Sequence, residues 1–101
     1  FFHGHDQLDL MPEAFAAMLP HLMCVNLYGM NPQGPKILPL GSGVRDRQIL
    51  QMIADSDYGG PIGLIDHRPE IDAEISLREN LAGMQAVLQD IGDEDALATY
   101  Q

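Results

Sequence analysis

The apolar positions of the chain follow two alternating patterns. In residues 9–22 they recur every three or four residues, with Pro12 in the first turn, which predicts a helix. The same spacing predicts helices over residues 44–58 and from about residue 69 to residue 91. Short apolar runs bounded by glycine and proline predict buried strands at residues 23–28, 37–40 and 62–65. The remnant of an earlier strand is predicted at the N-terminus.

The alternation of strands and helices predicts the fold class. Strands separated by helices form parallel α/β arrangements with right-handed crossovers. Residues 62–65 show no alternation with polar residues, as in a parallel sheet that is covered on both faces. A complete (β/α)₈ barrel needs about 250 residues, so a chain of 101 residues supplies at most about half of one. Two architectures therefore remain open: a three-layer α/β domain and a piece of a barrel.

Composition and charge limit the classes of partner that the protein is expected to bind. Apolar residues make up 46% of the chain, which predicts a globular protein. Fifteen acidic residues against five Lys and Arg give a net charge of −10, which repels nucleic acid and anionic lipid alike. No apolar run approaches the roughly 18 residues of a membrane helix, so we expect a cytoplasmic protein. Because the sequence opens at Phe1, we expect the native start to lie upstream. The acidic residues 93–101 predict a frayed tail.

The first group of candidate functional residues lies near the N-terminus. Ligands of parallel α/β folds bind at the carboxyl ends of the strands. In an extended segment His3 and His5 point to the same side, with Asp6 beside them. Imidazoles and a carboxylate are ligands for a divalent metal cation, so His3, His5 and Asp6 are candidate metal ligands. The alternative is that the histidines only form structural hydrogen bonds at the end of a strand.

A second group follows the last predicted strand. Asp66 and His67 pair a carboxylate with an imidazole and are the candidate catalytic residues, with His67 as general acid or base. The alternative is a turn that caps the next helix. Asn26, Ser42 and Arg68 are candidate substrate-binding residues. Ser42 lies between two glycines before a helix, where backbone N–H groups can hold a phosphate, although the same residues also suit a simple turn.

Four segments in chain order carry a resemblance to a known family. They are Phe2-His3-Gly4-His5-Asp6, Val25-Asn26-Leu27-Tyr28-Gly29-Met30, Ile37-Leu38-Pro39-Leu40-Gly41-Ser42-Gly43 and Tyr58-Gly59-Gly60-Pro61-Ile62-Gly63. Together they resemble the C-terminal half of a xylose isomerase-like TIM barrel, and the resemblance covers nearly the whole chain. It implies that residues 1–101 are a single segment, the C-terminal part of a parallel (β/α)₈ barrel with about three to four βα units.

The resemblance also implies a function. Members of this superfamily bind Mn, Mg, Co or Zn at the strand ends and isomerise or epimerise a sugar or sugar phosphate by proton transfer. His5 falls on the histidine of the family's Asp-x-x-His element, but Phe2 stands at its aspartate, Asn26 at a histidine and Ile65 at a glutamate. The alternative is therefore a non-catalytic carbohydrate-binding or structural relative without the metal. The expected macromolecular partner is the missing N-terminal half of the barrel or a second copy, because unpaired strand edges favour self-association.

Overall fold

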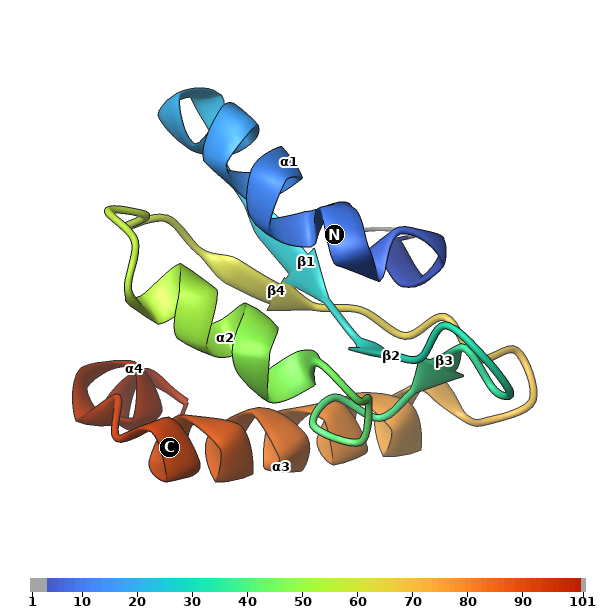
Figure 1. Cartoon of the computed structure of the whole chain (residues 1–101). Helices are drawn as coiled ribbons and strands as arrows, with labels where there is room; N and C mark the ends of the chain where they lie inside the picture. The colour runs from blue at the N-terminus through green and yellow to red at the C-terminus, as the bar shows by residue number, and fades with distance from the viewer. Residues whose placement is uncertain (1–3, 101) are drawn as a thin grey trace.

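The computed structural model describes residues 4–100, which form four α-helices, three short 3₁₀ helices and four short strands. In chain order these are η1 (Gly4–Asp6), η2 (Leu8–Leu10), α1 (Met11–Met18), η3 (Leu19–His21), β1 (Val25–Leu27), β2 (Gly29–Met30), β3 (Ile37–Leu38), α2 (Asp46–Ala54), β4 (Ile62–Leu64), α3 (Ala73–Ile91) and α4 (Glu94–Thr99). In Figure 1, the β1–β4 pair lies between α1 above and α2 below, and α3 lies below α2. None of the described helices is long and apolar enough to cross a bilayer.

The strands form two separate pairs, and the predicted (β/α)₈ barrel segment is wrong. β1 and β4 are parallel, with Val25 opposite Ile62, whereas β2 and β3 are antiparallel, with Gly29 opposite Leu38. A strand can join its neighbour in parallel only through a crossover of about a dozen residues or more. Only residues 31–36 separate β2 from β3, so β3 turns back as a hairpin and contributes no further parallel strand.

The predicted helices are confirmed at their centres, and α3 also ends at Ile91 as predicted, whereas α1 and α2 are shorter than expected. The helix expected over residues 9–22 is α-helical only over Met11–Met18, because Pro20 has no N–H group with which to continue the hydrogen bonding. The tail expected to be frayed contains α4, whose first turn is capped by Asp93. The Tyr100 hydroxyl donates to the carbonyl of Ile62 at 2.9 Å and holds the end of α4 against β4.

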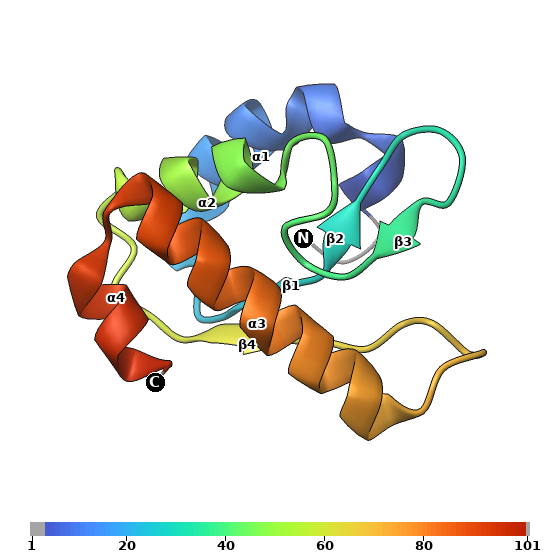
Figure 2. The ribbon, with the colours of Figure 1, turned by 90° about the horizontal axis from the view of Figure 1, so that it is seen from below.

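The core lies between the helices and the β1–β4 pair. Leu27 of β1, Met30 of β2 and Tyr28 between them pack in it with Leu50 of α2 and Met84 of α3. Figure 2 shows α1 and α2 on one side of β1 and β4. Helix α3 also approaches the segment after β3 closely: a Cβ atom at Gly83 would lie 1.6 Å from the carbonyl oxygen of Leu40, so only glycine fits there.

Candidate functional site

Three aromatic rings meet at the carboxyl end of the parallel pair. The ring of His67, which follows β4, is stacked on Tyr28, which follows β1, with 6.1 Å between centroids and 29° between planes. Tyr28 also forms a hydrogen bond with His5, whose Nδ1 lies 3.0 Å from the tyrosine hydroxyl. Because β1 and β4 are parallel and in register, the residues that follow them come out side by side. We call these three residues the ring row.

Burial differs along the ring row. Tyr28 is 2% exposed and His5 is 8% exposed, whereas His67 is half-buried. His67 and its neighbours Asp66, Arg68 and Pro69 line a surface hollow of about 390 Å³. His67 is therefore the member of the ring row that faces a space in which a small molecule fits.

The predicted metal ligands do not assemble into a metal site in the part of the chain that is described. His5 lies in a 3₁₀ helix and not in the extended segment that was expected, and His3 lies outside the described residues. The His5 Nε2 atom is 3.4 Å from Asp6 Oδ2, but the Lys36 ammonium group is 2.5 Å from Asp6 Oδ1 and neutralises that carboxylate. Residues 4–100 contain no group of three His, Cys, Asp or Glu placed to hold a metal ion. The prediction of a cation at His3, His5 and Asp6 therefore stays a prediction, because His3 lies outside that range, and we derive no step through the cation.

Asp66 is held in place by Ser76 of α3. The buried Ser76 hydroxyl donates to Asp66 Oδ1 at 2.7 Å, and the backbone N–H of Arg68 donates to the same oxygen at 3.1 Å. These two hydrogen bonds, helped by the positive charge of the Arg68 guanidinium group, lower the pKa of Asp66 below its usual range. Asp66 is therefore a carboxylate at neutral pH, directly beside His67 in the chain.

The Arg68 side chain points into the protein. Its Nη2 atom donates to Ser76 Oγ at 2.8 Å and to Glu79 Oε2 at 2.9 Å, and only 9% of the side chain is exposed. Arg68 thus fastens the loop after β4 to α3 instead of presenting its charge to a ligand. Sequence reasoning did not find Ser76 or Glu79, because nothing in a helix sequence shows which loop its polar residues will meet.

The loop around Ser42 is occupied by a side chain of the protein itself. Asp46 Oδ2 accepts the N–H groups of Gly41 and Gly43 at 2.9 and 2.7 Å, and Oδ1 accepts that of Met30 at 3.2 Å. The Ser42 N–H group donates to the carbonyl of Pro39. The N–H groups that the phosphate interpretation needs are therefore already bound within the protein. Burial raises the pKa of Asp46, and the three N–H donors partly offset that rise.

Two asparagines remain, of which Asn80 connects the two loops and Asn26 lies apart from them. The side chain of Asn80, 1% exposed in α3, accepts the N–H group of Leu40 at 2.8 Å and donates to the carbonyl of Ile65 at 3.1 Å. It thus ties the segment after β3 to the end of β4. The candidate substrate-binding residue Asn26 lies exposed within β1, opposite Gly63, and not at the strand end where the ring row forms.

Comparison of the chain with protein-family models, with curated proteins and with solved structures finds no match. The site is therefore interpreted from its own geometry.

Proposed function

We propose that the carboxyl end of the β1–β4 pair binds a sugar or sugar phosphate and moves a proton on it, as sugar isomerases and epimerases do. The observation that carries the proposal is the ring row, in which the half-buried His67 is stacked on the buried Tyr28 and lines a hollow. An imidazole is the side chain best suited to accept and return a proton near neutral pH.

The proposed chemistry uses His67 as the only residue that touches the substrate. Its imidazole takes the proton from a carbon next to the substrate carbonyl, which leaves an enediolate and an imidazolium. Return of the proton to the same carbon gives epimerisation. Return to the former carbonyl carbon, while the hydroxyl proton passes through water to the former carbonyl oxygen, gives isomerisation, so there is no net oxidation in either case. Asp66 stays ionised and stabilises the imidazolium that forms in between. Tyr28 and His5 are positioning residues, because their hydrogen bond fixes the ring on which His67 is stacked.

Carbohydrate binding without turnover is the second candidate. It is favoured by the hydrogen bonds of Asp66 and Arg68, whose polar atoms are engaged by Ser76 and Glu79. If those contacts persist when a ligand binds, His67 faces the ligand without a second catalytic group.

Solvent-exchange NMR tests both candidates. The protein is incubated in deuterated water with a panel of aldoses, ketoses and their phosphates, with and without Mn²⁺ or Mg²⁺, and deuterium incorporation next to the carbonyl is followed. We expect exchange with at least one sugar, reduced by roughly 100-fold or more in His67→Gln. His21→Gln, which changes an exposed histidine in η3, is the matched control and is expected to behave as the wild type.

The outcomes separate the candidates. Exchange that is equal in His67→Gln and in the wild type contradicts the proposed role of His67. Ligand shifts in the NMR spectrum without any exchange support binding without turnover and contradict the proton-transfer proposal. Absence of both shifts and exchange across the panel contradicts both candidates.

A further inference from the structure

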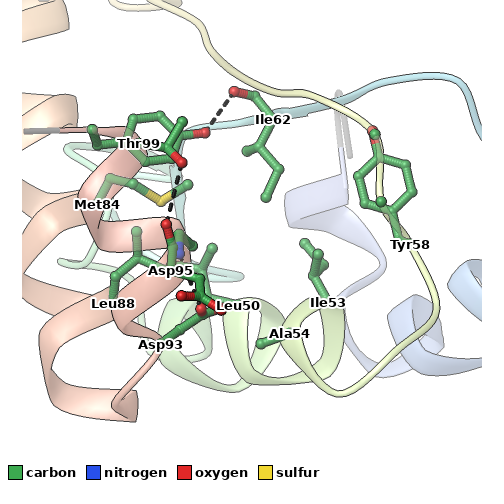
Figure 3. A pocket seen from close by; sticks show the side chains of 14 residues that line it. Leu50, Ile53, Ala54, Tyr58, Ile62, Met84, Leu88, Asp93, Asp95 and Thr99 are labelled. Carbon is green, nitrogen blue, oxygen red and sulfur yellow. Dashed lines mark hydrogen bonds between the residues drawn. The ribbon is translucent and has the colours of Figure 1, made fainter.

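A second pocket lies at the opposite end of β4 from the ring row. It has a volume of about 410 Å³, which falls in the range of small-molecule sites. Figure 3 shows Leu50 and Ile53 of α2 on one side of it and Met84 and Leu88 of α3 on another. These four residues are at most 5% exposed, so the floor of the pocket belongs to the apolar core. The pocket is thus separate from the proposed proton-transfer site.

Two tyrosines form part of the wall. The hydroxyl of Tyr58 donates to the carbonyl of Pro61, and that of Tyr100 donates to the carbonyl of Ile62. Both hydroxyl groups are therefore engaged with the backbone, and the aromatic rings are held at the pocket. The face of a tyrosine ring carries partial negative charge and attracts organic cations.

Asp93 and Asp95 form an acidic rim (Figure 3). Asp93 Oδ1 accepts the N–H group of Ala96 at 3.1 Å and caps α4, while Asp95 is exposed. The chain has five Lys and Arg residues, all of them described, and each forms an ion pair with another carboxylate: Lys36 with Asp6, Arg45 with Asp9, Arg47 with Asp90, Arg68 with Glu79 and Arg78 with Glu74. No Lys or Arg of the chain therefore neutralises the rim of the pocket.

We propose that this pocket binds a small organic ammonium ion with a compact apolar body. The ammonium group lies at the carboxylates of Asp93 and Asp95, and the apolar body lies on Leu50 and Met84, in the pocket that the tyrosine rings also line. Burial of hydrocarbon against the apolar floor is favourable. Among the residues that line the pocket, the only charged ones are the two aspartates of the rim, and their charge is negative. The net charge of −10 attracts cations to the protein from solution.

Calorimetric titration of the full chain at low ionic strength tests the proposal. The probes are n-hexylammonium, n-hexanol and n-hexanoate, which share the apolar body and differ in charge. We expect the ammonium ion to bind roughly tenfold or more tightly than the alcohol, and the carboxylate not to bind. Added salt weakens the binding of the ammonium ion. Equal affinity for the alcohol and the ammonium ion overturns the proposal, as does the absence of ammonium binding.

Variants of the rim test which carboxylates are responsible. The double variant Asp93→Asn, Asp95→Asn retains the helix cap, because asparagine caps as well as aspartate, and is expected to bind the ammonium ion roughly tenfold more weakly. Glu94→Gln is the matched control: it removes one charge from the same turn of α4 but does not line the pocket, and we expect less than about a twofold change.

The remaining outcomes are also decisive. A loss in Glu94→Gln as large as that in the double variant overturns the proposal, because the affinity would then depend only on general charge. Unchanged unfolding curves confirm that the variants are folded. Since His67→Gln leaves the pocket intact, ammonium binding is expected to be unchanged in that variant, and failure of one proposal does not affect the other.

Discussion

The sequences of the loop after β3 and the loop after β4 both predict a ligand site. In the structure the two loops differ in what binds their polar groups. In the first, the N–H groups of Gly41 and Gly43 are bound by the buried carboxylate of Asp46. In the second, Asp66 is bound by Ser76, and the adjacent His67 lines a hollow. The difference teaches that polar groups after a strand can meet a ligand only where one of them, here His67, lines a surface hollow while its neighbours are held by side chains of the same chain.

The two carboxylates of these loops also show how burial decides the direction of a pKa shift. Both accept hydrogen bonds, yet the pKa of Asp46 is raised and that of Asp66 is lowered. Asp46 is 2% exposed, and loss of water around its charge outweighs the three N–H donors. Asp66 keeps contact with solvent, so its hydrogen bonds determine the shift.

Among the changes that test this comparison, removal of the Asp46 carboxylate is expected to lower the free energy of unfolding most. Asp46→Ala leaves the buried N–H group of Met30 without its acceptor, which costs about 1–3 kcal/mol, and also removes the acceptor of the partly buried N–H groups of Gly41 and Gly43, so we expect a loss of about 3 kcal/mol. Asp46→Asn keeps one acceptor oxygen and is expected to lose less. Urea unfolding measures both. A loss in Asp46→Ala no greater than in Asp57→Ala, at an exposed loop position, would contradict the role of Asp46.

The contact between α3 and the loop after β3 is the second test. Gly83→Ala places a Cβ atom against the carbonyl oxygen of Leu40, so α3 must move away, and we expect a loss of about 1–3 kcal/mol. Alanine alone would favour the helix by about 1 kcal/mol, so the sign of the result separates packing from helix propensity. Gly59→Ala is the matched control, because no atom lies within 4 Å of the added Cβ. Stabilisation by Gly83→Ala would show that the close approach is absent.

Loss of the Ser76 hydroxyl is expected to have a smaller effect. Ser76→Ala removes one hydrogen bond to Asp66 and one from Arg68, and the Ser76 hydroxyl contributes about 1 kcal/mol, the typical net value for a hydrogen bond. The pKa of Asp66 should also move toward its ordinary value, which NMR titration of its carboxyl group measures. An unchanged Asp66 titration would show that Ser76 does not determine the shift.

The smallest expected effect is the pH dependence that Asp66 gives to the free energy of unfolding. Because its pKa is lowered in the folded protein, the unfolded chain binds more protons between the two pKa values, and stability rises with pH there. The stabilisation by Asp66 is therefore complete above its ordinary pKa of about 3.9 and is lost as pH falls through the folded value. Urea unfolding of the wild type and Asp66→Asn should differ at neutral pH and converge in acid. A difference that is constant with pH would contradict this assignment.

Local patterns predicted the secondary structure better than the arrangement of the strands. The centres of α1, α2 and α3 and the positions of β1 and β4 follow from apolar spacing, which depends only on neighbouring residues. The barrel resemblance failed at β3, where the short connection from β2 permits only a hairpin. Within the candidate site, Asp66 and His67 were predicted from their place after a strand, whereas the contacts of Tyr28 with His5 and His67 were not.

By itself the sequence determined the acidic charge, the centres of α1, α2 and α3 and the polar residues that follow each strand, because these depend on composition and on residues close together in the chain. Only the tertiary structure decided which of those residues meet. Asp46 fills its own loop, Ser76 reaches Asp66 across ten positions, and Tyr28 contacts both His5 and His67, which lie far apart in the chain. Such contacts arise when apolar surfaces pack, and packing is set by the whole core, so no local pattern contains them.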